Sequence, residues 1–420
     1  MILLLENIGK IKKAEIDIKG ITIIAGENNT GKSTVGKVLY SIFNSFYDIK
    51  GQIYQQKRAT ILNALTLIQM FNLGEKSNSF RIDDLTDIIL RKEKEYIKTP
   101  DMLAQDVYNF IVSTVNKEID ISSIEDILER IMSILKLKDK DFFNKVITDR
   151  FNKEFSAQIN NIYTKERASV QLNVQNYLID ITIKDNSVRL ISEQKLLNTE
   201  AIYIDDPFIL DDVGSMYFYD KNKRTNERKL DLSYKLYYKN DKKNTIDEMI
   251  LEEKLNKIYK QLNIVCEGTL EESNSGVGYK KLNSNETLDV RNISTGLKTF
   301  VILKTLLQKG WIEEKGTIIL DEPEIHLHPE WQLLLARLIV LLQKELNMHI
   351  LLNTHSPYFL NAIEVYSLKY NVDNKCKYYL ASEDEENKSV IIEDVSNYTE
   401  AIYKKLAKPL QDLEDERYAK

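Results

Sequence analysis

Residues 26–34, GENNTGKST, fit the pattern G-x-x-x-x-G-K-[ST] without a mismatch. Glycines at this spacing let backbone N–H groups turn toward a chain of phosphates, and the lysine reaches the terminal phosphates. The hydroxyl that follows the lysine can coordinate Mg²⁺. The stretch therefore predicts a nucleoside triphosphate site with Mg²⁺, and its candidate contacts are Gly26, Glu27, Asn28, Asn29, Thr30, Gly31, Lys32, Ser33 and Thr34.

Two further apolar runs end in polar groups that suit phosphate chemistry. The run GTIILDEP ends at Asp321 and Glu322, and the run MHILLNTHSP ends at His355. Asp321 is predicted to join Ser33 in holding Mg²⁺, and Glu322 to polarise the attacking water. His355 is predicted to reach a γ-phosphate from a neighbouring strand end. Glu322 and His355 are thus the candidate catalytic residues.

His326 and His328 lie two residues apart, directly after the candidate catalytic strand. Such a pair, with Glu324 or Glu330, raises the alternative of a zinc site. A zinc site needs three or four strong ligands, and no cysteine lies nearby. We therefore expect these histidines to shape the turn after the strand and to pack at a subunit contact.

The elements that must position these groups follow from hydrophobic spacing. GITIIAG predicts a buried strand before the Gly-rich loop, and KSTVGKVLYSIFNSF predicts the helix after it. ILLLENI and KAEIDI predict two strands around a Gly-Lys turn, and Asp185-Asn186 predicts a second tight turn. AIYIDD predicts another buried strand.

Between these strands, residues 51–168 are dominated by apolar residues at three- and four-residue spacing, typical of separate amphipathic helices. The expected organisation is an ATPase head at 1–50, an inserted helical lobe at 51–168, the rest of the head at 169–400 and a C-terminal helix or tail at 401–420. The fold class expected is α/β, a mixed sheet flanked by helices.

Composition narrows the class of protein. The 420 residues carry a formal net charge of −6, so a protein that coats nucleic acid over its whole surface is not expected. The two cysteines, Cys266 and Cys376, form no disulfide or zinc pattern. Because we find neither a leader sequence nor a membrane-spanning run, we expect a cytoplasmic protein without membrane contact.

One local exception to the negative charge is the segment 220–243, which holds nine basic and four acidic residues. The segment is expected to be an exposed loop. It is also the best candidate in this sequence for contact with nucleic acid. The residues proposed for that contact are Lys223, Arg224, Arg228 and Lys229.

In order and spacing, these motifs resemble those of ABC-type ATPases of the SMC/RecF/OLD branch. The resemblance rests on GENNTGKST, NISTGLKTF at 292–300, TIILDEPEIHLHP and LLNTHSP, and it covers about residues 1–45 and 195–400. It identifies Ser294, Thr295 and Gly296 as a variant signature, His326 and His328 as a D-loop-like turn, and His355 as the switch histidine. Thr295 and Leu297 depart from the family's usual Gly and Gln, and no glutamine of a Q-loop is found.

The resemblance implies ATP and Mg²⁺ as cofactors and a homodimer in which each signature completes the partner's site. The first hypothesis is a slow ATPase switch that regulates a separate effector, as in two-gene anti-phage systems such as Septu or PARIS. The alternative is a RecF-like repair ATPase that binds duplex DNA. A transporter subunit is less favoured because the insertion is long. The short acidic tail after His355 does not fit an OLD-type metal-dependent nuclease.

Overall fold

A computed structural model of the chain describes residues 1–72, 82–115, 124–164, 166–174, 177–192, 197–214, 226–240, 245–273, 276–282, 284–384 and 388–418. The chain forms two compact units. The larger is Met1–Tyr47 together with Ile147–Lys420, and the smaller is Asp48–Val146. Each is described by itself.

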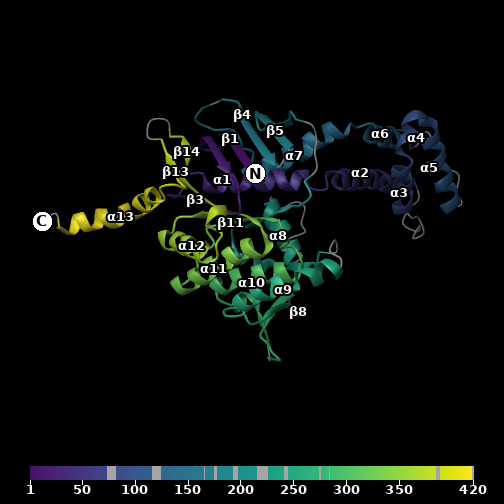
Figure 1. Cartoon of the computed structure of the whole chain (residues 1–420). Helices are drawn as coiled ribbons and strands as arrows, with labels where there is room; N and C mark the ends of the chain where they lie inside the picture. Colours follow the sequence, from purple (N-terminus) through teal and green to yellow (C-terminus); the bar gives the residue numbers. More distant parts are fainter. Residues whose placement is uncertain are drawn as a thin grey trace. The chain divides into compact units, whose positions relative to one another are not determined.

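An 11-stranded mixed sheet runs through the larger unit (Figure 1), in the order β6-β5-β4-β1-β2-β14-β13-β3-β12-β11-β7. The strands β13, β3, β12, β11 and β7 are parallel neighbours, and β6 to β2 pair antiparallel. The expected α/β fold is confirmed. The strands are β1 (Ile2–Ile8), β2 (Ile11–Asp17), β3 (Ile21–Gly26), β4 (Ala168–Val174), β5 (Tyr177–Lys184), β6 (Ser187–Leu190), β7 (Ala201–Ile204), β11 (Thr317–Asp321), β12 (His349–Thr354), β13 (Cys376–Glu383) and β14 (Val390–Asp394).

The larger unit also contains helices and a second, smaller sheet. The small antiparallel sheet has the order β10-β9-β8. These elements are α1 (Lys32–Phe46), α7 (Asp139–Phe155, which begins in the smaller unit), α8 (Glu227–Tyr237), α9 (Thr245–Leu262), β8 (Thr269–Ser273), β9 (Gly276–Lys280), β10 (Thr287–Asp289), α10 (Thr295–Gln308), α11 (Pro329–Leu346), α12 (Pro357–Lys369), α13 (Glu400–Tyr418) and the short 3₁₀ helices η2 (Pro207–Asp212), η4 (Val290–Asn292) and η5 (Asp373–Lys375).

Side-chain alternation along the central strands places helices on both faces of the sheet. Ile318 and Leu320 of β11 belong to the main core, which also takes the buried faces of α10, α11 and α12. Ile319, between them, faces Gly36 of α1 instead. Because successive strand residues point to opposite faces, the helix after the Gly-rich loop covers the side opposite the main core.

Both tight turns expected from the sequence are present. Strands β1 and β2 pair through Ile8 and Ile11, with Gly9 at φ 55° in the turn. Strands β5 and β6 are joined by Asp185 and Asn186, at φ 50° and 57°. Positive φ at both central residues is what a type I′ hairpin requires, and it suits the right-handed twist of the strands.

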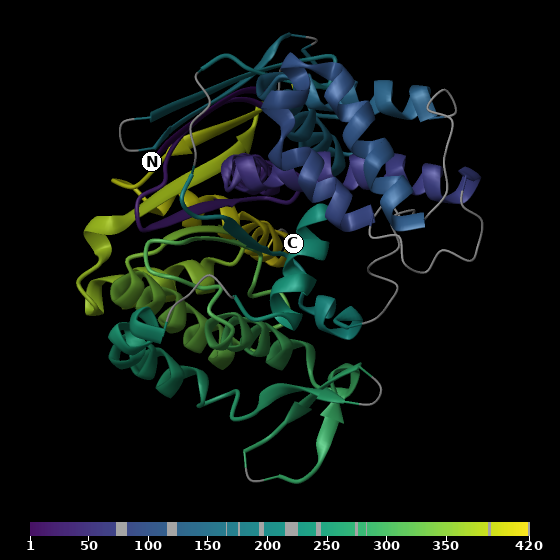
Figure 2. The same cartoon turned by 90° about the vertical axis from the view of Figure 1, so that its right-hand side faces the viewer.

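The smaller unit is helical, with α2 (Ile49–Asn72), α3 (Ile82–Arg91), α4 (Glu93–Lys98), α5 (Pro100–Val115) and α6 (Glu125–Leu135). These helices share a core of their own, with Ile61, Leu85, Ile111 and Ile131 among its buried members. Figure 2 shows them gathered together in purple and blue. The separate helices predicted for this region are thus observed.

The smaller unit ends at Val146, whereas the lobe expected from the sequence extends to residue 168. The difference has a local cause. The Gly9 N–H donates to the Ile159 carbonyl at 2.8 Å, and the Asn161 N–H donates to the Asn7 carbonyl at 2.8 Å. These bonds attach the chain after α7 to the β1–β2 turn. The strand β4 that follows pairs directly with β1.

The expectation of an exposed loop at 220–243 is wrong for the part that the structure describes. Residues Glu227–Tyr237 form helix α8, and Leu232 and Leu236 are buried in the main core. Apolar residues four apart are the helical signal, and the high local charge obscured it. Residues 220–225 and 241–243 lie outside the described residues.

Candidate active site

The Gly-rich loop joins the end of β3 to the first turn of α1. Gly31, directly before the helix, has φ 72°, and Asn29 has φ 66°. These left-handed conformations turn the chain so that α1 begins with Lys32 and Ser33. The free N–H groups and the positive end of the dipole at a helix N-terminus favour phosphate. The local backbone is therefore that of a phosphate-binding loop.

Lys32 is buried beneath this loop. Its Nζ donates to the carbonyl oxygens of Gly26 at 2.9 Å and Glu27 at 2.7 Å, and it lies 3.7 Å from Oε1 of Glu322. Burial lowers the pKa of Lys32 below its ordinary value, and the nearby Glu322 and Asp321 oppose that shift. The one strongly basic group of the loop thus faces the carboxylates at the end of β11.

Asp321, the last residue of β11, has both carboxylate oxygens fixed. The Tyr203 hydroxyl donates to Oδ2 at 2.7 Å, and Nδ2 of Asn353 donates to Oδ1 at 2.9 Å. Tyr203 and Asn353 come from β7 and β12, the two neighbours of β11 in the sheet. The arrangement orients a hard oxygen ligand, which is the type that Mg²⁺ prefers.

Glu322 has an unusual backbone and a central position. Its φ is 51°, in the left-handed region that a Glu rarely adopts, and its N–H donates to the Asn353 carbonyl at 3.0 Å. Its Oε1 also lies 3.4 Å from Nδ1 of His355. Strained backbone of this kind persists where surrounding contacts enforce it, often at functional sites. Lys32, Glu322 and His355, from three separate segments, therefore meet at one point.

Sequence reasoning did not assign Glu324 to this site, and considered it only as a zinc ligand. Its side chain is buried and accepts a hydrogen bond from the Thr354 hydroxyl, which in turn accepts one from the Ser356 N–H at 3.1 Å. Burial raises the pKa of Glu324 above its ordinary value. The hydrogen bond from Thr354 and the nearby His355 act in the opposite direction, but burial has the larger effect. Glu324 thus links the turn after β11 to the end of β12. Tyr203 and Asn353 were missed as well.

His326 and His328 do not share a site in the structure. His326 packs edge-on against Phe208, with ring centroids 5.7 Å apart, and His328 directly precedes Pro329 at the start of α11. Within the described ranges, no three His, Cys, Asp or Glu residues gather closely enough to hold a metal ion. Both histidines lie in the segment that leads from β11 to α11.

The signature-like segment forms the N-terminus of α10. Ser294 is exposed, and its Oγ accepts from the Leu297 N–H at 3.4 Å, which caps the helix. Thr295 is the first residue of the helix. A Cβ on Gly296 would lie 3.1 Å from the His326 carbonyl and 3.2 Å from the Trp331 ring, so glycine allows a close approach. The signature segment and the turn after β11 therefore pack against each other in one chain.

The residues proposed for nucleic-acid contact have other partners where they are described. Arg228 is buried and pairs with Glu154 and Asp205, and Lys229 pairs with Asp206 at 2.8 Å. Lys223 and Arg224 lie outside the described residues. The Arg228 guanidinium is already paired with two carboxylates, so its position lends no support to the expected contact with nucleic acid, which stays a prediction.

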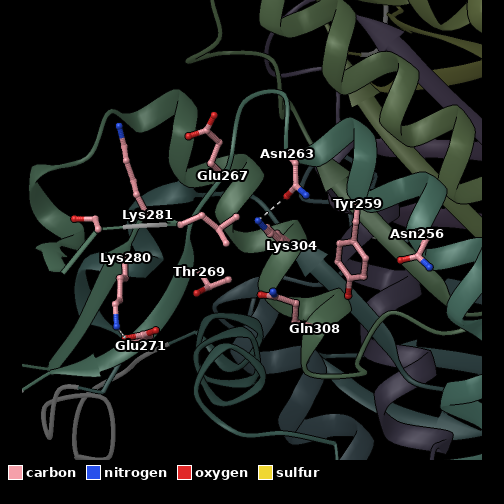
Figure 3. A pocket seen from close by; sticks show the side chains of 12 residues that line it. Asn256, Tyr259, Asn263, Glu267, Thr269, Glu271, Lys280, Lys281, Lys304 and Gln308 are labelled. Atoms are coloured by element: carbon pink, nitrogen blue, oxygen red, sulfur yellow. Dashed lines mark hydrogen bonds and ion pairs between the residues drawn. The ribbon is translucent and has the colours of Figure 1, made fainter. Parts of the chain in front are cut away.

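A separate open cleft of about 670 Å³ lies between α9, α10 and the β8–β9 hairpin (Figure 3). At its base the buried Lys304 donates to Oδ1 of Asn263 at 2.8 Å and to the Cys266 carbonyl at 2.7 Å. The residues that line it include none of the loop, β11 or β12 residues described above. This cleft is distinct from the phosphate loop.

Solved structures similar to this chain include heads of SMC proteins. One, bound to the C-winged helix domain of ScpA, is 10% identical with a TM-score of 0.40, covering 95% of this chain and 98% of that one. The SMC head domain from Thermotoga maritima is 10% identical with a TM-score of 0.38, covering 94% and 98%. The Smc head with an extended coiled coil bound to the C-terminal domain of ScpA, derived from Pyrococcus furiosus, is 13% identical with a TM-score of 0.40, covering 99% and 98%.

The family comparison covers most of the chain. The model of the AAA ATPase domain matches residues 1–360, which contain the phosphate loop, the β11 carboxylates, the signature-like segment and His355. No described helix is both long and apolar enough to cross a membrane. The chain belongs to the AAA ATPase domain family, and it is an ATPase of that family.

Proposed function

We propose that this protein binds ATP with Mg²⁺ at residues 26–34 and hydrolyses it slowly as a head-to-tail homodimer. In this proposal the dimer acts as a switch that holds or regulates a separate effector protein in the bacterial cytoplasm. The observation that carries the proposal is the meeting of Lys32, Glu322 and His355 beside Asp321, while Ser294 stays exposed at the start of α10.

Each residue has a role that its position supports. The α1 N-terminus and Lys32 bind the phosphates, with Lys32 exchanging its bonds to loop carbonyls for phosphate oxygens. The Ser33 hydroxyl and the Asp321 carboxylate form a set of hard oxygens that fits Mg²⁺, which would neutralise charge on the β- and γ-phosphates. Glu322 orients a water for attack, and His355, in contact with Glu322, donates toward the γ-phosphate.

The position of the signature-like segment supports the proposed dimer. Ser294 bonds within its own helical turn and is exposed, so it can meet a second copy of the chain. A contact supplied by a partner to a phosphoryl group in transfer is worth about 10³–10⁵ in rate. The packing of Gly296 against the turn that holds His326 means that this turn would lie at the same contact.

The role as a regulator of an effector has two supports. The first is the resemblance to ATPase subunits of two-gene anti-phage systems. The second is the helical unit Asp48–Val146, which has its own core and is therefore suited to act as a docking module. A RecF-like function would need a free basic surface. The pairing of Arg228 and Lys229 with carboxylates lends no support to such a surface at α8.

The test is ATP turnover by the purified chain with and without duplex DNA. Glu322→Gln serves as the catalytic blank, and Glu393→Gln, which changes an exposed carboxylate on β14, serves as the matched control. We expect slow turnover that DNA does not change, that Glu322→Gln abolishes and that Glu393→Gln preserves. Stimulation by DNA that fades with salt would support the repair function instead. Turnover that survives Glu322→Gln would refute the catalytic assignment.

A further inference from the structure

Tyr203 occupies a position that hydrolysis of ATP does not by itself explain. Its ring is 1% exposed and packs edge-on against Tyr40, with ring centroids 6.1 Å apart, while its hydroxyl donates to Asp321. From this buried position the Tyr203 hydroxyl fixes one of the two oxygens of the Asp321 carboxylate.

The helix of the phosphate loop leaves room for this ring. A Cβ on Gly36 would lie 3.0 Å from Cε2 and 3.2 Å from the hydroxyl oxygen of Tyr203. Glycine inside a helix is less stable than alanine, and the close contact with Tyr203 gives a packing reason for its presence in α1. The phosphate-loop helix and the Asp321 strand end thus meet across the Tyr203 side chain.

Arg228 of α8 lies over the ring of Tyr203. Its guanidinium carbon is 5.0 Å from the centre of the Tyr203 ring, a cation–π distance. The same guanidinium donates from Nε to Asp205 at 2.9 Å and from Nη1 to Glu154. Burial lowers the pKa of Arg228, but Asp205 and Glu154 raise it above its ordinary value. The group is therefore a fixed cation.

Glu154 connects this cluster to α7. Its side chain is fully buried and accepts both from Nη1 of Arg228 and, at 3.2 Å, from the Arg228 N–H. Helix α7 begins at Asp139 in the smaller unit and ends at Phe155 in the larger one. A buried ion pair contributes little net stability against an apolar replacement, but loss of one partner leaves a costly unpaired charge. The Arg228–Glu154 pair therefore fixes the position of α8 against α7 at this point.

We propose that Tyr203 is the positioning residue for Asp321, and that Tyr203, Arg228 and Glu154 form a buried link between the Mg²⁺-binding strand end and helix α7. A change in the position of Asp321 upon Mg²⁺ binding is passed through these contacts to the part of α7 that holds Glu154, and a change at that part of α7 is passed back to Asp321. This inference rests on the proposed role of Asp321 as a Mg²⁺ ligand.

The first experiment measures the Mg²⁺ concentration that half-saturates binding of a fluorescent ATP analogue to the full chain. We expect Tyr203→Phe to raise it about tenfold, because one hydrogen bond to a charged group is removed. Tyr279→Phe is the matched control. It removes a hydroxyl from another buried tyrosine, one that accepts from the Gly268 N–H at 2.8 Å. The control should leave the Mg²⁺ dependence unchanged.

The second experiment follows hydrogen exchange in peptides that cover residues 147–155 and 227–237, with the ATP analogue present and Mg²⁺ absent or added. Mg²⁺ should slow exchange in both peptides of the wild-type chain and of Tyr279→Phe. In Tyr203→Phe and in Arg228→Lys, added Mg²⁺ should leave the rate of hydrogen exchange in both peptides unchanged. Arg228→Lys keeps the positive charge but cannot hydrogen-bond to two carboxylates as the guanidinium does. The effects of Tyr203→Phe and Arg228→Lys should not add, because both break one link.

The inference would be overturned by an unchanged Mg²⁺ dependence in Tyr203→Phe, or by equal changes in Tyr203→Phe and Tyr279→Phe. It would also be overturned if Mg²⁺ still slowed hydrogen exchange in α7 in both Tyr203→Phe and Arg228→Lys. Failure of the proposed function gives a different pattern. A wild-type chain that binds the analogue with no response to Mg²⁺ would reject Asp321 as a ligand before any variant is compared. Loss of binding in Tyr203→Phe without Mg²⁺ would show that the hydroxyl supports the loop, and would also reject the link.

Discussion

Nζ of Lys32 lies 3.7 Å from Oε1 of Glu322, and the same oxygen lies 3.4 Å from Nδ1 of His355. The lysine comes from the first turn of α1, the glutamate from the residue after β11 and the histidine from the residue after β12. A carboxylate placed between a buried ammonium group and an imidazole can orient a water toward a phosphate held by the lysine. This relationship leads to the predictions below.

Lys32→Ala should weaken binding of a fluorescent ATP analogue by about 10- to 100-fold, the effect of losing hydrogen bonds from a charged donor. The measurement is equilibrium titration of the purified chain. Lys405→Ala is the matched control, since Lys405 contacts Glu27 of the same loop at 3.4 Å but is 36% exposed. An exposed pair of this kind is worth no more than about 1 kcal/mol, so the control should change affinity less than about fivefold. Equal losses in both variants would contradict the role of Lys32.

The signature-like segment allows a test of the composite site by mixing variants. Ser294→Arg and Lys32→Ala should each abolish turnover alone. Mixed in equal amounts, they form heterodimers in which one site has an intact Lys32 and an intact Ser294. Random pairing restores about a quarter of the wild-type number of complete sites, as two-fold symmetry requires. Turnover that stays at zero in the mixture, with dimers present by light scattering, would rule out a site shared between two chains.

Gly36→Ala should destabilise the folded chain even though alanine favours helix. The added Cβ would lie 2.9 Å from Cγ2 of Ile319 and 3.0 Å from the Tyr203 ring. Overpacking in a buried contact costs about 1–3 kcal/mol, which exceeds the helix-propensity gain of up to about 1 kcal/mol. The midpoint of urea unfolding should therefore fall. A rise in the midpoint would show that the ring moves aside freely.

The buried Glu324 predicts a pH dependence of stability. Burial raises its pKa in the folded chain above the ordinary value of 4.5, so the folded state binds more protons than the unfolded state above that pH. Stability is then lost as pH rises from 4.5 through the raised pKa. The measurement is the midpoint of urea unfolding at successive pH values. In Glu324→Gln this midpoint should fall less with rising pH than it does in the wild-type chain. Glu154, whose pKa burial also raises, should contribute a similar loss that remains in the variant.

The control for that pH series is Glu393→Gln, in which an exposed carboxylate on β14 becomes an amide. Its unfolding midpoints should follow those of the wild-type chain across the whole range. A pH profile of Glu324→Gln that matches the wild-type profile would mean that Glu324 keeps an ordinary pKa in the folded state.

Much of the fold and the chemistry of the loop could be predicted because their signals are local. The strand β3, the loop and α1 are encoded by an apolar run, two glycines and helical spacing within one short segment. The Asp185-Asn186 turn is predictable for the same reason, since positive φ at two successive residues restricts the residue types. Asp321, Glu322 and His355 were predicted because parallel strands bring their carboxyl ends to one edge of a sheet.

Tertiary structure alone decided which side chains support those groups. Tyr203 and Asn353 are ordinary strand residues by sequence, and only the β7-β11-β12 neighbourhood places them on the two oxygens of Asp321. Arg228 belongs to a basic segment, and the segment's charge suggested an exposed loop. Folding instead buries the guanidinium between Glu154 and Asp205. Contacts between residues far apart in the chain depend on packing and strand order, and no local pattern of residue types records them.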